Sequence, residues 1–314
     1  MKHIIAVAVV FIFTIVMIPI ALGAVYSAEH RHVTEVGSYG VHDEFLVTIY
    51  RSETSTFEEI ELERYLIGVV AAEMPALFHV EALRAQAVAA RTYALRILAH
   101  HDYLLDTVAH QVFLDDDQLR ERWGSDFDQH FATIEEAVMS TRGMVLIYEG
   151  ELITPMFFAM SSGATENSED VFASARPYLR SVASGGYEDQ DNFAVEAPFE
   201  LAALREAFGN TSLSLEELEI LEWTEGGNVA AIQIGDEVFT GREVRETLGL
   251  RSAAFSIEKR HERIVFTTYG HGHGVGMSQT GANVMANDGD DYVAILKHFY
   301  QNAELVDKSL INVE

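Results

Sequence analysis

The sequence contains no cysteine, which excludes disulfide bonds, thiol nucleophiles and cysteine-ligated zinc. Basic residues are also scarce: 21 lysines and arginines stand against 49 aspartates and glutamates, giving a formal charge of −28. Because no surplus of basic residues exists to neutralise phosphates, we expect no nucleic-acid partner. The chain also lacks internal repeats and low-complexity tracts. Since 48% of the residues are hydrophobic, the composition predicts a folded core. The excess of acidic residues predicts an acidic, soluble surface around it.

One long apolar run, residues 4–25, carries no charge and is long enough to cross a bilayer as a helix. Lys2 precedes this run and acidic residues follow it, which predicts that the N-terminus stays in the cytoplasm. The alternative is a cleaved signal peptide whose apolar part ends at Pro19. We expect a membrane anchor over residues 1–26 and a tether over 27–40. Under either alternative the remaining chain is exported.

Hydrophobic periodicity predicts an α+β fold over residues 41–305, with helices segregated from antiparallel hairpins. Within it we expect irregular structure over 102–130, a β-rich subdomain over 187–262, and a C-terminal tail over 306–314. Turn signals predict a hairpin around Glu149-Gly150 and two further turns in the subdomain. The further turns are at Gly226-Gly227 and Gly235-Asp236, the predicted strands are 41–52 and 263–270, and the predicted helices are 58–74, 80–101, 199–208, 242–248 and 291–300.

Glu73 lies in the segment AAEMPA, residues 71–76, among small and apolar residues. Helical spacing places it on the apolar stripe of the predicted helix, at its C-terminal end. Burial and the negative end of the helix dipole both raise the pKa of a carboxyl there, which suits a general acid. The alternative is a glutamate at the edge of the core that pairs with Arg84 or Arg91. The apolar residues of the stripe are Leu62, Leu66 and Val69.

A second candidate is the segment GHGHGVGMSQTGA, residues 270–282, with five glycines and two histidines. Glycines allow a backbone to approach a ligand closely. His271 and His273 either hydrogen-bond a polar substrate or begin a metal site, although an H-x-H pair without a third ligand is a weak metal signal. Ser278 lacks the G-x-S-x-G context of a hydrolase and suits a helix cap. A tight turn without function is the alternative.

A third candidate is SSGATENSED, residues 161–170. Ser161, Ser162 and Gly163 predict a loop lined by hydroxyl and amide groups, and Glu166 supplies a second carboxyl group. The alternative is an ordinary turn that leads into an acidic helix start, because serine, asparagine and aspartate favour turns.

These stretches together resemble the stage II sporulation protein D family of spore-forming bacteria. The similarity runs in order over residues 45–301 and carries a helix-pair signature and a histidine-glycine loop. The matching segments are GVVAAEMPALFHVEALRAQAVAARTYAL (68–95), TRGMVLIYEG (141–150), SSGATENSED (161–170), PYLRSV (177–182) and GHGHGVGMSQTGA (270–282).

The resemblance implies a membrane-anchored lytic transglycosylase of peptidoglycan that acts in engulfment of the forespore, from the mother-cell membrane facing the septal space. Its substrate would be glycan strands stripped of stem peptides, and its partners would be stage II sporulation proteins P and M. Glu73 matches the catalytic acid of the family, and no cofactor or metal is expected. Substrate-orienting or acid-pairing roles are then expected for Arg91, Ser161, Ser162, Gly163, Glu166, His271, His273 and Gln279.

The sequence departs from the family at three places. Some relatives bind zinc through cysteine and histidine in the region matching residues 106–113, where this chain has Ala109 and His110. The serine loop has Ala164 in place of an expected second glycine, and Thr280 stands where relatives usually have tyrosine. None of these departures affects the predicted acid.

Two other classes of function remain open at this point. Related domains occur in amidase enhancers, so the chain is alternatively a wall-binding activator without catalysis. A histidine-dependent metalloenzyme is a further alternative, which would lose activity with a chelator. The enzyme hypothesis requires Glu73, the loop at 161–163 and the loop at 271–273 to lie together, although about 200 positions separate the first from the last.

Overall fold

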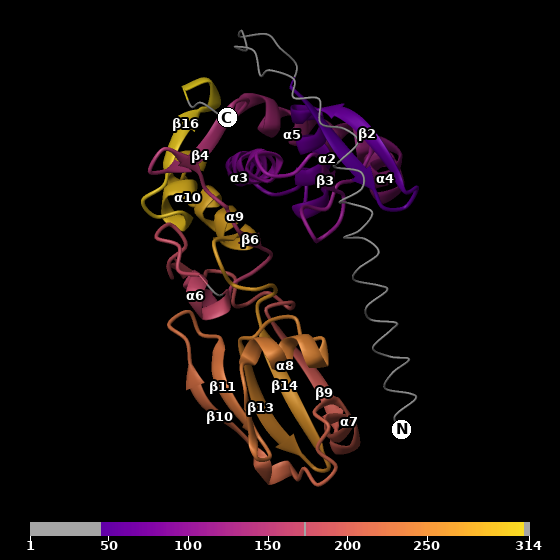
Figure 1. Cartoon of the computed structure of the whole chain (residues 1–314), viewed down its shortest axis with the longest axis vertical. Helices are drawn as coiled ribbons and strands as arrows, with labels where there is room; N and C mark the ends of the chain where they lie inside the picture. The colour runs from indigo at the N-terminus through magenta and orange to yellow at the C-terminus, as the bar shows by residue number, and fades with distance from the viewer. Residues whose placement is uncertain (1–44, 173, 311–314) are drawn as a thin grey trace. The chain divides into compact units, whose positions relative to one another are not determined.

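The computed structural model of the chain describes residues 45–172 and 174–310. Helices and mostly antiparallel sheets alternate in separate groups, which confirms the predicted α+β class (Figure 1). The predicted anchor over 1–26 and tether over 27–40 lie outside the described residues. Among the residues that are described, no helix has both the length and the apolar character needed to cross a membrane.

Two consecutive helices form the centre of the larger core. The helix α2 (Leu62–Glu73) begins where the Glu61 side chain accepts a hydrogen bond from the backbone of Arg64. It ends at Met74, which is extended because the next residue is a proline. The helix α3 (Val80–Leu98) is rich in alanine, all of it buried, so neighbouring elements approach it closely. It packs against α2, α5, α9, α10 and β4.

Among the remaining helices of the described residues, α5, α9 and α10 pack against α3, and the other four have eight residues or fewer. The helix α4 begins with a capping box between Asp115 and Gln118, and α8 begins with another between Thr240 and Glu243. Three short 3₁₀ helices lie at 124–126, 215–217 and 308–310. The other helices are α4 (Asp116–Trp123), α5 (Phe127–Ser140), α6 (Ser168–Val171), α7 (Leu201–Ala207), α8 (Gly241–Leu248), α9 (Gln279–Asn287) and α10 (Tyr292–Phe299).

Six small sheets complete the described fold, and only the pairs β1–β3 and β15–β6 are parallel. Their strand orders are β2-β1-β3, β16-β4-β5, β15-β6, β7-β8, β10-β11-β12 and β13-β14-β9. The strands are β1 (Leu46–Arg51), β2 (Thr56–Glu61), β3 (Leu104–Leu105), β4 (Met144–Tyr148), β5 (Glu151–Leu152), β6 (Phe157–Phe158), β7 (Gly163–Ala164), β8 (Ala183–Ser184), β9 (Ala194–Glu200), β10 (Leu218–Trp223), β11 (Val229–Ile234), β12 (Glu237–Phe239), β13 (Phe255–Arg260), β14 (Arg263–Tyr269), β15 (Met277–Ser278) and β16 (Glu304–Asp307).

The apolar residues form two separate cores. The larger one surrounds α2 and α3 and includes side chains of β1, β4, α9 and α10. The smaller one lies between α7, α8 and the strands β9 to β14, drawn in orange in Figure 1. Its buried members are Leu204, Leu213, Leu218, Val229, Ile232, Ile234, Val244, Leu250, Phe255, Ile264 and Phe266.

The structure corrects three local predictions. The predicted helix over 58–74 begins only at Leu62, because the preceding residues pair with β1 as the strand β2. The predicted irregular segment 102–130 contains α4 and the start of α5. The strand β16 crosses the predicted boundary at residue 305 and pairs with β4. Only the third difference depends on a contact between residues that are distant in the sequence, because β2 forms a hairpin with β1 and α4 is capped within its own segment.

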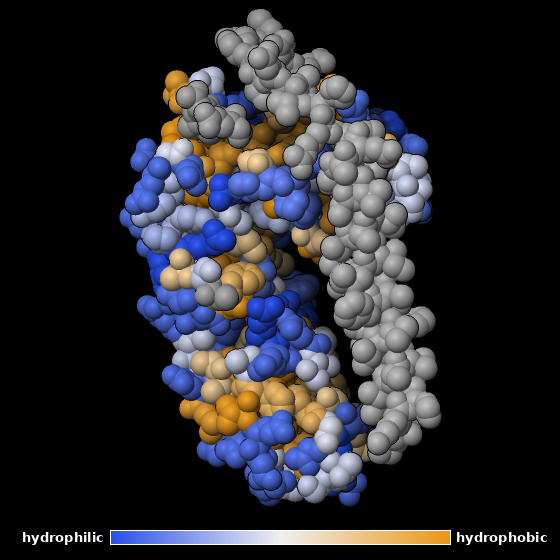
Figure 2. All heavy atoms as spheres, viewed as in Figure 1, coloured by the Kyte–Doolittle hydropathy of each residue, from blue (hydrophilic) through white to orange (hydrophobic). Residues whose placement is uncertain are grey.

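The described surface is largely hydrophilic. Figure 2 shows mostly hydrophilic residues on the visible face, with apolar areas between them. Many of the acidic side chains that give the chain its charge of −28 are exposed, and several form surface ion pairs such as Arg263 with Glu200. This distribution agrees with the acidic surface expected from the composition.

Candidate functional site

Glu73 is the last residue of α2, and its side chain is mostly enclosed while the residue keeps part of its surface exposed. Its Oε1 accepts a hydrogen bond from the backbone nitrogen of Val112 at 3.4 Å. The side chain of Gln279 donates a second hydrogen bond to the carboxylate. Burial raises the pKa of Glu73, and these two hydrogen bonds oppose the rise without cancelling it. The carboxyl therefore has the accessibility and raised pKa of a general acid.

Gln279 brings the histidine-glycine loop to Glu73. It is the first residue of α9, whose N-terminus is capped by Ser278 accepting a hydrogen bond from Gly281, as predicted for this serine. The Gln279 amide also lies 3.5 Å from Oε1 of Gln86, in the middle of α3. Two segments separated by about 200 positions thus meet at one carboxyl group.

Three buried polar atoms near this carboxyl have no hydrogen-bond partner within the described part of the chain: the Tyr65 hydroxyl, Nε2 of Gln86 and Oε1 of Gln111. The Tyr65 pKa is raised by burial and by the negative charges of Tyr93 and Glu73, which places its hydroxyl near the acid. These polar neighbours were not predicted from the sequence. A signal was present for Gln86, an uncharged polar residue in an otherwise alanine-rich helix.

Arg91 is a correction to the predicted site. Its side chain is fully buried and pairs with Glu63, with Nη2 2.5 Å from Oε2. It also donates hydrogen bonds to the carbonyl oxygens of Met144 and Val138. The guanidinium is therefore engaged inside the larger core, and it neither pairs with Glu73 nor meets solvent. Arg84, the other predicted partner, pairs with Glu81 and Glu136 instead.

The serine loop packs directly against the histidine-glycine loop. Ser161 is buried, and its hydroxyl lies 2.5 Å from both the carbonyl oxygen of Ser184 and the hydroxyl of Tyr187. Its backbone nitrogen donates to Oγ of Ser278. Ser161 therefore joins the two loops instead of facing solvent. Ser162 and Gly163 keep partial exposure, so a contact between them and a substrate stays a prediction.

Glu166 is buried as well and links three segments. Its backbone nitrogen donates to the carbonyl oxygen of Gly274 at 2.7 Å. Its Oε1 accepts hydrogen bonds from the Thr224 hydroxyl and the Asn228 backbone, both at 2.9 Å. Since only 1% of the residue is exposed, a direct substrate contact is not available to it. Glu166 instead fixes the turn between β10 and β11 to the histidine-glycine loop.

Burial raises the pKa of Glu166, and measurements of stability at different pH values can test this shift. Because the folded state binds the proton more tightly, the contribution of Glu166 to stability is present at low pH and is lost as pH rises through its folded-state pKa. Replacing Glu166 with glutamine should remove this dependence. Chemical denaturation across a pH series should therefore show the wild type losing stability relative to Glu166→Gln as pH rises. A parallel pH dependence of the two proteins would contradict the assignment, and Glu121→Gln, at an exposed position, is the control.

The two histidines of the loop differ in environment. His271 is exposed, and its backbone pairs with Met160. The His273 ring lies between Phe158 and Phe172, with centroid distances of 5.5 and 5.6 Å. Burial and the charges of nearby arginines lower the pKa of His273 to about 4, so its imidazole is neutral near pH 7. Its Nδ1 accepts a hydrogen bond from the backbone of Val275, which leaves the proton on Nε2.

Within the described ranges, no group of three or more histidine, aspartate or glutamate residues is arranged so that it could hold a metal ion. His110, in the region where some relatives bind zinc, uses Nδ1 to accept a hydrogen bond from the backbone of Leu105. Burial and the neighbouring His101 lower the pKa of His110. The expectation of a metal-independent site remains a prediction.

The shape of the histidine-glycine loop depends on Gly276, which has a φ of +81°. A Cβ atom at this position would collide with the carbonyl group of Met156. We therefore expect Gly276→Ala to lower the free energy of unfolding by more than about 3 kcal/mol. Gly289, with a φ of +107° and no neighbour near its Cβ position, is the matched control and should cost only about 1–2 kcal/mol when replaced by alanine. If urea denaturation shows equal losses of unfolding free energy for the two variants, the collision with Met156 does not explain the cost at Gly276.

The sequence of the chain is similar to those of known proteins. A sequence profile of the family described as "Stage II sporulation protein" matches residues 50–148. The chain is 40% identical to stage II sporulation protein D of Bacillus amyloliquefaciens and 38% identical to that of Bacillus subtilis, in each case over 82% of this chain and 78% of the relative. It is also 28% identical to a Bacillus subtilis protein named amidase enhancer, over 76% of this chain and 40% of that protein. The chain belongs to the stage II sporulation protein D family.

Proposed function

We propose that this chain is a lytic transglycosylase that cleaves the β-1,4 bond between N-acetylmuramic acid and N-acetylglucosamine, with Glu73 as its catalytic acid. The observation that supports it most is the environment of Glu73: a partly exposed carboxyl whose pKa is raised by burial and which Gln279, from a distant loop, holds by a hydrogen bond. A carboxyl that remains protonated can donate a proton to a leaving oxygen.

The proposed reaction needs one carboxyl group. Protonated Glu73 gives its proton to the glycosidic oxygen while positive charge develops at the anomeric carbon. The resulting carboxylate then removes the proton from the C6 hydroxyl of the same muramyl residue. That oxygen bonds to the anomeric carbon and closes a 1,6-anhydro ring, so Glu73 ends the cycle protonated and no water is consumed. A second acidic residue is unnecessary, which agrees with the burial of Glu166.

The proposed setting is the cell wall of a sporulating bacterium during engulfment. The substrate would be glycan strands freed of stem peptides, and the partners would be stage II sporulation proteins P and M. Residues 1–26 would anchor the chain in the mother-cell membrane, with the rest on the extracytoplasmic side. The family membership supports the role in sporulation, and the other parts of this setting are proposals.

The second candidate is a wall-binding activator of an amidase, favoured by the similarity to the protein named amidase enhancer. Digestion of purified peptide-free glycan strands by the full chain, followed by mass spectrometry of the products, separates the two. We expect 1,6-anhydromuramyl ends, in equal yield with and without a chelator. Absence of such ends would overturn the enzyme proposal, and their loss on chelation would favour a metal-dependent enzyme.

A further inference from the structure

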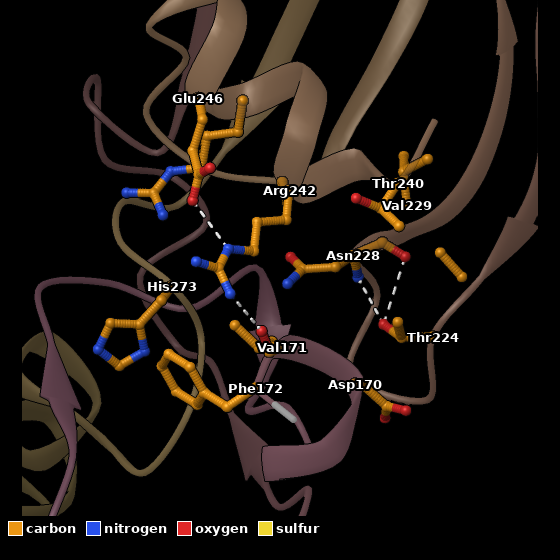
Figure 3. A pocket seen from close by; sticks show the side chains of 13 residues that line it. Asp170, Val171, Phe172, Thr224, Asn228, Val229, Thr240, Arg242, Glu246 and His273 are labelled. Atoms are coloured by element: carbon orange, nitrogen blue, oxygen red, sulfur yellow. Dashed lines mark hydrogen bonds and ion pairs between the residues drawn. The ribbon is translucent and has the colours of Figure 1, made fainter. Parts of the chain in front are cut away.

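A cavity of about 250 Å³ lies between α6, α8 and the turn that joins β10 to β11 (Figure 3). His273 of the histidine-glycine loop forms part of its wall. The volume is smaller than that of most drug-sized binding pockets, so the cavity suits a single sugar ring or smaller group. The other lining residues are Asp170, Val171, Phe172, Thr224, Asn228, Val229, Ala230, Thr240, Arg242, Arg245, Glu246 and Ala253.

Arg242 and Phe172 form one wall of this cavity. Nε of Arg242 donates to Glu246 at 2.8 Å, and its Nη1 donates to the carbonyl oxygen of Val171 at 2.9 Å. The guanidinium carbon lies 5.9 Å from the centre of the Phe172 ring. Figure 3 shows the Arg242 guanidinium between Glu246 and Val171, with His273 and Phe172 on the same side of the cavity. The wall thus combines fixed donors with an aromatic face, a combination suited to a sugar derivative.

Arg245 and Asn228 supply donors that the described part of the protein leaves largely unused. Nε of Arg245 donates to the carbonyl oxygen of Leu250, while no carboxylate of a described residue lies within ion-pair distance of its guanidinium. Burial lowers the pKa of Arg245, so the charged form is held in a partly desolvated position. The Asn228 backbone is fixed by Glu166, but its side-chain amide forms no hydrogen bond to a described residue. Both groups line the cavity.

The two acidic residues of the lining are already engaged. Glu246 accepts the hydrogen bond from Arg242, and Asp170 accepts one from Asn167 at 3.1 Å. The pKa values of His271 and His273 are lowered by burial and by neighbouring arginines, Arg245 among them in both cases. The lining thus holds two arginines and two acidic residues, and Arg242 is paired with Glu246. The guanidinium of Arg245 is left to bind a ligand with negative charge.

We propose that this cavity binds the free lactyl carboxylate of a muramyl residue, with Arg245 as the main charged partner and Asn228 as a second donor. This inference rests on the proposed function, because it takes the glycan strand as the ligand. A planar guanidinium pairs with a carboxylate through two parallel hydrogen bonds. A stem peptide converts the lactyl carboxylate to an amide, which removes the charge and adds bulk. The cavity would therefore select strands from which the peptide has been removed.

The cavity and Glu73 are connected by one short piece of chain. His273 lines the cavity and Gln279 contacts Glu73, and the two residues are six positions apart in the sequence. Even a fully extended segment of this length spans at most about 21 Å. Glu166 and Ser161 fix the neighbouring segments to this same loop. A single glycan strand of a few sugars is therefore long enough to reach from the cavity to the acid.

The test measures binding to the full chain carrying Glu73→Gln, so that the ligand stays intact. The ligands are a tetrasaccharide of alternating N-acetylglucosamine and N-acetylmuramic acid with free lactyl groups, the same tetrasaccharide bearing stem peptides, and chitotetraose, which has no carboxylate. We expect calorimetry to show the tightest binding for the first ligand. Adding Arg245→Gln should weaken that binding by at least about 10-fold, the loss of a charged hydrogen bond, and leave chitotetraose binding unchanged.

Arg205→Gln is the matched control, because Nε of Arg205 also donates to a backbone carbonyl, that of Leu213, outside the cavity. Arg245→Lys should give a smaller loss, since it keeps the charge but not the bidentate geometry. Stronger binding of the peptide-bearing ligand would assign the cavity to a stem-peptide carboxylate and overturn the proposal, as would equal binding of chitotetraose. If the wild type forms anhydromuramyl ends but Arg245→Gln has no effect on binding, this inference is overturned. The proposed function then remains intact.

Discussion

Replacing Glu73 with glutamine is expected to lower the rate of glycan cleavage by about 10²- to 10⁴-fold, the usual contribution of a general acid. Glutamine has nearly the same shape, and its carbonyl oxygen can still accept the hydrogen bond from Val112. It cannot donate a proton to the leaving oxygen as a carboxylic acid does, nor remove one from the C6 hydroxyl. The measurement is the initial rate of appearance of 1,6-anhydromuramyl ends from peptide-free strands.

Two controls make this result specific. Glu121→Gln, at an exposed position on α4, should cleave at the wild-type rate. Glu73→Gln should unfold at the same temperature as the wild type or higher, because it removes a carboxyl whose charged form is disfavoured by burial. A variant that folds normally and keeps more than about a tenth of the wild-type rate would be inconsistent with Glu73 as the acid.

The rate at which the wild type cleaves glycan strands should also depend on pH, in a direction that the pKa of Glu73 determines. Because burial raises its pKa, the protonated and active form persists to a higher pH than for an exposed glutamate. As pH rises through this pKa, the acid is lost and the initial rate should fall. A rate that increases over the same interval would indicate that the required group acts first as a base.

Much of the fold was predictable because its signals are local. The alanine-rich α3, the hairpin of β4 and β5 at Glu149-Gly150, and the turns on either side of β11 all arise from residues close together in the sequence. The apolar stripe of α2 was equally clear, since Leu62, Leu66 and Val69 are all buried. A short-range pattern of this kind is visible in a single chain without any tertiary information.

The partners of charged residues were less predictable, because they depend on tertiary contacts. Glu166 looks like a solvent-facing residue in a polar segment, yet the turn at Gly226 covers it so closely that a Cβ atom there would collide with its carboxyl group. The arginines of α8 show a helical surface pattern in the sequence, and only the packing of α8 beside α6 brings them to one cavity. Sequence spacing shows which residues share a helix face, but not what that face meets.

Arg91 is the clearest example of a charged residue whose partner was not predictable from the sequence. Its replacement also has the largest expected effect on stability. Replacing it with methionine should lower the free energy of unfolding by about 3–5 kcal/mol, because Glu63 would remain buried without its partner. The backbone carbonyls of Met144 and Val138 would lose their donors as well. Urea denaturation of the full chain measures this loss directly. Arg263→Met, which breaks the exposed pair with Glu200, is the matched control and should change stability little.

The double replacement Glu63→Leu with Arg91→Met separates two explanations for that loss. If the cost comes from the unpaired charge, removing both charges should recover more than half of it, since apolar residues of similar volume often replace a buried ion pair without loss. If Arg91 is needed mainly for its hydrogen bonds to the two carbonyl oxygens, the double variant should be no more stable than Arg91→Met. We expect recovery, because Glu63 receives three of the five hydrogen bonds that Arg91 donates and carries the only opposite charge within its reach among the described residues. A double variant that recovers stability would keep Glu73 and Gln279 in place. It should therefore cleave glycan strands at close to the wild-type rate, as expected if Arg91 takes no part in the reaction.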